Sequence, residues 1–194
     1  MLFRSLHHYP ATDWRQKLII KREGKEFFME EKTDQRKKIN YGILMHRALS
    51  RVHYKDQIDE VLKKLNLEGV IMEDEALLLK NKLEAMMEHP VIGKWFTKDW
   101  RVLTEVPVII PGGAQDRLDR VIHKEVTRKN QLKHKAIIID YKTGGRKAED
   151  RKQVETYSQA LLEMGYVDVE GYLLYLDKLE VLLVVNKTNL SLEL

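Results

Sequence analysis

Apolar residues in the first half of the chain recur at the three- and four-residue spacing of amphipathic helices. This spacing predicts helices over 39–52, 58–65 and 73–88. The polar stretch 66–69, which ends in glycine, separates the second helix from the third, and Pro90 stops the third. Three consecutive helices are therefore expected before the first strand.

Other segments of this half have weaker patterns. A short helix is predicted over 14–21, with Asp13 as its N-cap and Gly24 beyond its end. The dense charge run at 30–38 is expected to be a solvated linker or the entry to the next helix. Residues 91–100 are expected to form a short helix and a turn.

The pattern changes to strands at residue 101. Stretches rich in β-branched residues predict five strands, over 102–110, 117–123, 135–141, 170–176 and 181–185. Between the third and the fourth strand, apolar residues return to helical spacing over 149–164. Pro111-Gly112-Gly113 and Gly144-Gly145 predict turns, and 186–194 is expected to be a polar tail.

The order of these elements is three helices, three strands, a helix and two strands. Such an order is typical of an α/β or α+β domain built on a central sheet. A chain of 194 residues is long enough to bury a sizeable core, so we expect a single domain over 1–194. Its mainly helical part is 1–98, its sheet core is 99–185, and its tail is 186–194.

Composition narrows the chemistry that the chain can carry. Hydrophobic residues make up 43% and charged residues 33%, as in globular proteins. The chain has no cysteine, which excludes disulfides, thiolate zinc sites, iron–sulfur clusters and cysteine nucleophiles. A metal would have to be held by oxygen or imidazole. Because no apolar run is long enough to span a membrane, we expect a soluble cytoplasmic protein.

The positive charge of the chain is concentrated in one predicted loop. Lysine and arginine exceed aspartate and glutamate by 34 to 30, a net charge of +4. The predicted loop at 124–135 carries the same net charge. Its cations are Lys124, Arg128, Lys129, Lys133 and Lys135. The loop is interpreted either as an element that contacts a nucleic-acid backbone or as a solvated hairpin loop.

A carboxylate and an ammonium end the third predicted strand. Asp140 and Lys142 are two residues apart, so they lie on one face of the strand. Asp119 lies in the preceding apolar strand and would converge with Asp140 if the two strands are neighbours. Paired carboxylates need charge compensation, which a hard divalent cation supplies. The alternative is an ordinary ion pair at the end of a strand.

Four further polar residues lie outside this strand pair. His46 lies on the apolar side of a predicted helix, as either a ligand or a hydrogen-bonded core histidine. Glu105 lies in a strand, where an inward-pointing carboxylate needs a partner. Gln153 and Tyr157 are four apart, hence on one helix face. Alternatively, Gln153 is solvated and Tyr157 belongs to the core.

Taken together, these residues resemble the RecB-like branch of the PD-(D/E)XK nuclease superfamily. The shared pattern is a helical G-x-x-x-H-x-x-L, then E-x-P, a strand Asp, D-Y-K-T-G and Q-x-x-x-Y. In this chain it comprises Gly42, His46, Leu49, Glu105, Pro107, Asp119, Asp140, Lys142, Gly144, Gln153 and Tyr157. The chain resembles in particular the C-terminal nuclease domains of AddA-type helicase–nucleases.

The resemblance implies a restriction-endonuclease-like fold, in which a mixed central β-sheet is flanked by helices and preceded by a helical segment. It also implies a Mg²⁺- or Mn²⁺-dependent deoxyribonuclease, an exonuclease of DNA recombination and repair. The partners implied are DNA and an ATP-dependent helicase domain or subunit. The chain itself has no G-x-x-x-x-G-K-[ST] motif and therefore no P-loop.

By the same resemblance, Asp119, Asp140, His46 and the backbone carbonyl of Tyr141 would bind the metal. Lys142 would position the attacking water. Gln153 and Tyr157 would support the site or contact the DNA backbone, and Glu105 would be an auxiliary carboxylate.

Two positions leave alternatives open. Leu118 stands where the superfamily nominally has proline, a replacement that the RecB-like branch tolerates. Asp116 competes with Asp119 for the role of the first acid, and Asp119 is preferred because Leu118 and Val121 place it in the more apolar part of the strand. The other functional interpretation is an inactive module of the same fold that binds nucleic acid or protein in a repair complex.

Overall fold

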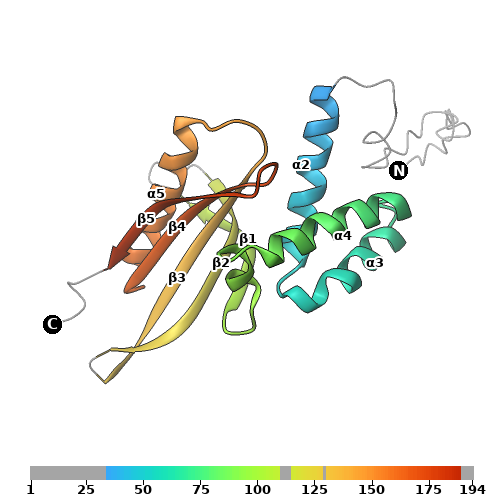
Figure 1. Ribbon diagram of the computed structural model, residues 1–194. Coiled ribbons are helices and arrows are strands. Elements are labelled where there is room, and N and C mark those ends of the chain that lie inside the picture. The colour runs from blue at the N-terminus through green and yellow to red at the C-terminus, as the bar shows by residue number, and fades with distance from the viewer. Residues whose placement is uncertain (1–33, 110–114, 129, 189–194) are drawn as a thin grey trace, which may run out of the picture.

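A computed structural model describes residues 34–109, 115–128 and 130–188. Figure 1 shows the chain as a ribbon. In chain order the elements are α2 (Asp34–Arg51), η1 (Lys55–Gln57), α3 (Ile58–Leu67), α4 (Glu73–Glu88), η2 (Ile92–Phe96), β1 (Arg101–Ile109), β2 (Gln115–Arg128), β3 (Gln131–Lys142), α5 (Ala148–Glu163), β4 (Asp168–Tyr175) and β5 (Glu180–Thr188).

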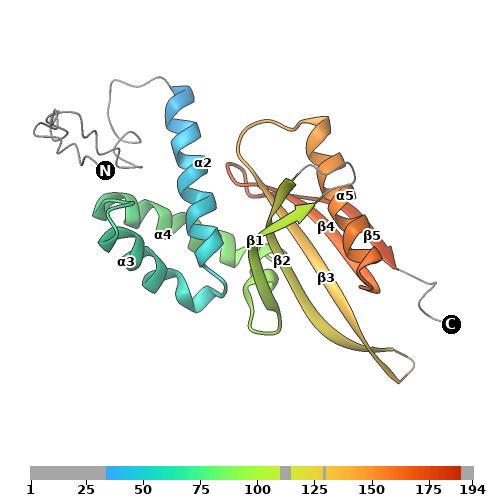
Figure 2. The ribbon, with the colours of Figure 1, turned by 180° about the vertical axis from the view of Figure 1, so that it is seen from behind.

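The five strands form one mixed sheet in the order β1-β2-β3-β4-β5. All neighbours are antiparallel except β3 and β4, which are parallel. A parallel pair needs a crossover connection, and α5 supplies it. Helices α2, α3 and α4 lie together on the opposite side of the sheet from α5, as Figures 1 and 2 show from two sides. The predicted fold class, a mixed sheet with flanking helices and a helical N-terminal part, is confirmed.

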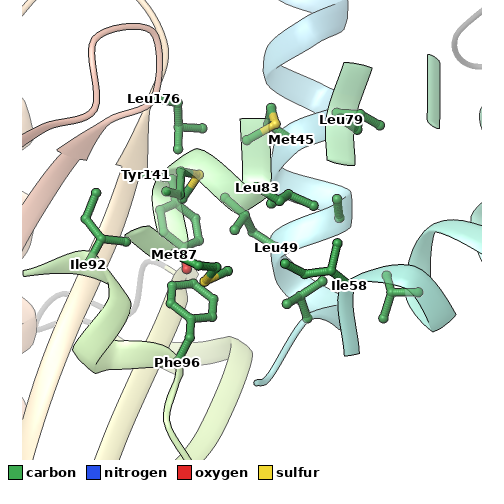
Figure 3. Packing of buried hydrophobic residues seen from close by; sticks show 14 of the residues in the cluster. Met45, Leu49, Ile58, Leu79, Leu83, Met87, Ile92, Phe96, Tyr141 and Leu176 are labelled. Atoms are coloured by element: carbon green, nitrogen blue, oxygen red, sulfur yellow. The ribbon is translucent and has the colours of Figure 1, made fainter. Parts of the chain in front are cut away.

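The central strand β3 is buried on both faces. Ile137, Ile139 and Tyr141 belong to the large core cluster that the helices α2, α3 and α4 form with the sheet. Figure 3 shows part of this cluster around Met45, Leu49 and Tyr141. Ala136 and Ile138 face the other way and pack in the cluster under α5. Burial on both faces explains why this strand is a continuous apolar run in the sequence.

Arg120 connects the helical part to the sheet. The side chain is fully buried in the middle of β2. Its guanidinium donates to the backbone carbonyls of Val52 (2.9 Å), His53 (2.6 Å) and Trp95 (3.4 Å). The guanidinium carbon also lies 4.0 Å from the centre of the Phe96 ring. A buried cation requires such partners, so Arg120 joins β2 to the chain just after α2 and to η2.

The predicted loop at 124–135 is wrong, because these residues continue β2 and β3. The two strands pair from Arg120–Ile139 to Arg128–Gln131, and their turn lies between 128 and 131. β4 pairs with β3 only from Lys135 onward. The tip of the hairpin is therefore a two-stranded ribbon that extends from the sheet (Figure 1). Its side chains are mostly exposed, so the strands carry no apolar alternation for a sequence pattern to reveal.

Two other boundaries differ from the predicted ones. α2 begins at Asp34, so residues 34–38 of the predicted charge run are helical. β5 continues to Thr188 into the predicted tail, since Thr188 still pairs with Asp168 at the edge of the sheet, where polar residues are common. The predicted helix at 14–21 and the turn at 111–113 lie outside the described residues.

No helix in the described part of the chain is both long enough and apolar enough to cross a membrane.

We expect Arg120→Met to lower the free energy of unfolding by about 3 kcal/mol or more, because three backbone carbonyls, two of them in buried residues, lose a donor. Urea denaturation followed by circular dichroism measures the change. Arg151→Met, at an exposed position of α5, is the matched control and should change stability by less than about 0.5 kcal/mol. Equal stabilities of the two variants would contradict this role of Arg120.

Candidate active site

The predicted carboxylates lie where β2 and β3 separate. The last pair between these strands is Arg120–Ile139, and Asp119 and Asp140 come next in the register. From this point β2 continues along β1, and β3 continues along β4. The backbone N–H of Tyr141 donates to Oδ2 of Asp119 at 2.8 Å instead of to a strand partner on β2. The separation thus leaves a fork with one carboxylate on each strand.

Asp140 is the most buried carboxylate of the fork. Its side chain is 4% exposed, and Nζ of Lys142 lies 2.7 Å from its Oδ2. Apart from this ion pair, Oδ2 has no hydrogen-bonding partner among the described residues. Burial, reinforced by the charge of Asp119, raises the pKa of Asp140 to about 6, although Lys142 opposes the shift. Asp140 is therefore a carboxylate whose charge is incompletely compensated by the protein.

Lys142 is held by acceptors on α5 as well as by Asp140. Its Nζ donates to Oε1 of Gln153 at 3.0 Å and lies 3.9 Å from Oδ1 of Asp150. Burial lowers the pKa of Lys142, but the charges of Asp140, Asp150 and Asp119 outweigh burial, so that the pKa lies above its ordinary value. The ammonium is thus charged and fixed in position.

His46 of α2 lies beside the carboxylates and not in the apolar core. Its Nδ1 is 3.4 Å from Oδ1 of Asp119, and the side chain is 32% exposed. The imidazole ring stands edge-on to Tyr141, with ring centres 5.7 Å apart. Burial lowers the pKa of His46, but the hydrogen bond to Asp119 and the charges of Asp119, Asp140 and Glu105 give a net rise. The structure therefore favours a role in the site over the core alternative.

Gly42 lets α2 approach the end of β3. A Cβ atom at this position would lie 2.8 Å from Oγ1 and 3.2 Å from Cγ2 of Thr143. Thr143 directly follows Lys142, and His46 lies one helical turn after Gly42. The missing side chain is thus the physical reason for glycine in the G-x-x-x-H pattern.

Gln153 and Tyr157 also lie at the site, together with Asp116. Nε2 of Gln153 donates to Oδ2 of Asp116 at 3.0 Å and to the hydroxyl of Tyr157 at 2.8 Å. Hydrogen bonding by Tyr157 is the main cause that lowers the pKa of Asp116. Because Asp116 and Tyr157 accept from the amide nitrogen, the amide oxygen of Gln153 faces Lys142.

The close packing of α5 on the sheet positions these side chains. A Cβ atom at Gly171 of β4 would lie 2.5 Å from Cγ1 of Val154 and 2.9 Å from Oγ of Ser158. Gln153 immediately precedes Val154, so the glycine brings the polar face of α5 down to the strand ends.

The structure brings both candidate first acids to the site, in different places. Asp119 faces His46 and acts electrostatically on Asp140, whereas Asp116 faces α5. Leu118 and Val121 both pack under α5, although residues three apart in a regular strand point to opposite faces. The alternation of side chains along β2 is therefore shifted by one residue between them. The geometry favours Asp119 as the partner of Asp140.

Glu105 lies across from Asp119, on β1. The pairing of β1 with β2 skips both residues, and Glu105 has a φ of 56°, which L-residues rarely adopt in a strand. Its carboxylate pairs with Nε of Arg117 at 2.7 Å. Glu105 thus has the partner that its position demands, and it reaches the site only through its charge on His46.

The predicted DNA-contacting cations do not form a free basic loop. Arg128 pairs with Asp168 at 2.7 Å, and Lys135 pairs with Glu170 at 2.5 Å. Nζ of Lys124 lies 4.4 Å from the centre of the Trp100 ring. Both acidic partners lie on β4, which is distant in sequence from the predicted loop. Lys133 also has an interaction partner, and Lys129 lies outside the described residues.

The donors at the fork suit a hard divalent cation. Two carboxylates and an imidazole converge there, and the buried Oδ2 of Asp140 has no partner among the described residues except the Lys142 ammonium. Among the described residues, no three His, Asp or Glu side chains are already arranged as a cation cage. In the present geometry Asp119 is engaged with His46 and with the Tyr141 amide. A cation would replace the first of these contacts.

Asp150 was missed at the sequence level. It lies one helical turn before Gln153, on the same face of α5, and it accepts from the backbone N–H of Lys147 at 3.1 Å. That three-residue spacing was a usable signal. By contrast, no pattern marks the buried Arg120 next to Asp119.

Comparison with known families agrees with this geometry. Residues 16–185 match the model of the PD-(D/E)XK nuclease superfamily. The match covers most of the chain, which therefore belongs to this superfamily. No curated protein matches the chain in sequence.

We expect Asp140→Asn to stabilise the metal-free protein progressively as the pH rises. The raised pKa of Asp140 means that its contribution to stability is present below about pH 4 and is lost as the pH passes about 6. Between pH 4 and pH 8, the stability of the variant relative to wild type should rise by about 2–3 kcal/mol in urea denaturation with EDTA. The exposed Asp74→Asn should change by less than about 1 kcal/mol. A pH-independent difference for Asp140→Asn would refute the assignment.

We expect Gly42→Ala to weaken Mn²⁺ binding several-fold, because the new methyl group would displace α2, and with it His46, from Asp119. Isothermal titration calorimetry measures the affinity. Thr143→Ala removes both atoms that the methyl group meets most closely, so the double variant should regain most of the affinity. Failure of Thr143→Ala to rescue binding would show that the contact with Thr143 is not the cause.

Proposed function

We propose that this member of the PD-(D/E)XK superfamily is a Mg²⁺- or Mn²⁺-dependent deoxyribonuclease that hydrolyses phosphodiester bonds. The observation that carries the proposal is the fork itself. There Asp119 and Asp140 converge, Lys142 lies 2.7 Å from Asp140, and His46 lies 3.4 Å from Asp119. These residue types are the ones that metal-assisted phosphodiester hydrolysis requires.

Asp119, Asp140, His46 and the backbone carbonyl of Tyr141 would hold the cation. When bound, it would polarise the phosphate and lower the pKa of a coordinated water. The raised pKa of Asp140 implies that below about pH 6 the carboxyl group is mostly protonated, so that cation binding there would release a proton.

Lys142 would orient the attacking water and balance the charge that develops on the phosphate. The side chain is suited to this because Gln153 and Asp140 hold the ammonium from two sides. Gln153 is itself fixed by Asp116 and Tyr157, so these residues would keep Lys142 in place.

A hollow of about 530 Å³ adjoins the fork on the α5 side. Three carboxylates line it, from Asp116, Glu149 and Asp150, against the single cation Lys152. A polyanion approaching such a wall is repelled unless a cation is present. The charge around the fork therefore supports a metal requirement.

The finer proposal is that the protein is an exonuclease that acts with an ATP-driven helicase in recombination and repair. Its support is the resemblance to AddA-type nuclease domains. The 194 residues contain no P-loop, so the motor would be supplied by another domain or subunit.

We expect Asp140→Ala and Lys142→Ala each to lower the rate of DNA cleavage at least about a hundredfold with little loss of fold. Cleavage is measured on end-labelled single- and double-stranded DNA, linear and circular, with Mg²⁺, with Mn²⁺ and with EDTA. Wild type should degrade linear DNA, spare closed circles and be inactive in EDTA.

Lys63→Ala, an exposed lysine of α3, is the matched control and should cleave as wild type does. Near wild-type cleavage by either active-site variant would reject the assigned roles. If wild type binds DNA but does not cleave it under any metal condition, the inactive binding module becomes the better interpretation. Cleavage of closed circles would overturn the exonuclease proposal alone.

A further inference from the structure

A second cavity lies away from the fork, between α2, α4 and the turn from β4 to β5. It has a volume of about 600 Å³ and a largely apolar wall. Tyr41 and Leu44 of α2, Leu78 and Leu79 of α4, and Asp177 of the turn contribute to the wall. Leu78 is 49% exposed, so an apolar side chain stands at the rim. A cavity of this size can hold one or two large side chains.

One acidic side chain in the wall is incompletely satisfied. Glu75 of α4 is 2% exposed. Its Oε2 accepts the backbone N–H of Met72 at 2.6 Å, but its Oε1 makes no hydrogen bond with any described residue. An unsatisfied buried carboxylate oxygen is costly, and a donor or cation that enters the cavity would lower that cost.

Charge defines the occupant further. The acidic residues of the cavity are Glu75 and Asp177, against one cation, Lys82. An occupant with bulky apolar side chains and a cation on the same face would match both the wall and its charge.

The segment 14–21 of this chain has that composition. Trp14, Leu18 and Lys21 fall on one face at helical spacing, and the stretch has cations and no acidic residue. The superfamily match begins at residue 16, so residues 16–21 of this segment are part of the matched domain.

The segment is also within reach. The residues that join it to α2 can span up to roughly 40 Å when extended. Tyr41 lies only about two helical turns into α2, so the cavity is roughly 10 Å from the start of that helix.

We propose that residues 14–21 dock as a helix in the cavity between α2 and α4, with Trp14 and Leu18 against the apolar wall and Lys21 beside Glu75. Docking would also brace the active site, because two residues of the wall adjoin it. Asp177 accepts the backbone N–H of Gly144 at 3.1 Å, and Tyr41 precedes Gly42. The proposal does not depend on the proposed nuclease function.

The absence of cysteine from the sequence allows a direct test in the full-length chain. Leu18→Cys combined with Leu78→Cys should form an intramolecular disulfide under mild oxidation, identified by peptide mass spectrometry. Leu18→Cys with Leu67→Cys is the matched control, because Leu67 is 77% exposed on α3 and outside the cavity wall. The first pair should close at least tenfold faster than the second.

Charge provides an independent check in the same cysteine background. Lys21→Glu should slow closure of the Leu18–Leu78 pair several-fold, whereas Lys25→Glu, beyond the docked segment, should leave it unchanged. Equal closure of the two cysteine pairs would overturn the proposal. So would disulfides that form only between two molecules, which would mean that a second copy occupies the cavity, or equal effects of the two charge reversals.

Discussion

A guanidinium buried without a carboxylate partner determines how the two halves of the protein meet. The two terminal nitrogens of Arg120 donate to backbone carbonyls from the chain that follows α2 and from η2. These acceptors are available in only one relative arrangement of helices and sheet, so the cation selects that arrangement. Because Arg120 directly follows Asp119, the same contact brings the His46 side of α2 up to the fork. Stability and assembly of the site are therefore linked through one residue.

The fork itself opposes folding. Two carboxylates converge there, and one of them is buried enough that its neutral form is favoured below about pH 6. Lys142 only partly compensates, because α5 and Asp150 also hold it. Such unfavourable electrostatics are typical of sites that await a cation. The apolar clusters on both faces of β3 stabilise the fold by hydrophobic burial, and this stabilisation offsets the electrostatic cost of the fork.

The sequence predicted helices and strands best where one face of the element is buried, because burial there gives the apolar residues a regular spacing. Helix α4 and strand β1 match their predicted limits closely, and Asp140 with Lys142 follow from strand alternation. The hairpin tip was missed because its strands cover no core. Contacts between distant segments, such as Lys135 with Glu170 or Gly42 with Thr143, leave no local trace in the sequence. Arg120 and Glu75 are single buried charged residues, and no repeating sequence pattern reveals their burial.

The position of the fork in the chain has a consequence for synthesis on the ribosome. His46 emerges long before the carboxylates, and Lys142 reaches its place only when α5 and β4 have been made and have packed on β3. A nascent or prematurely terminated chain therefore holds separate fragments of the site and not the site. The β3–α5–β4 crossover thus makes the arrangement at the fork depend on synthesis of the chain through β4.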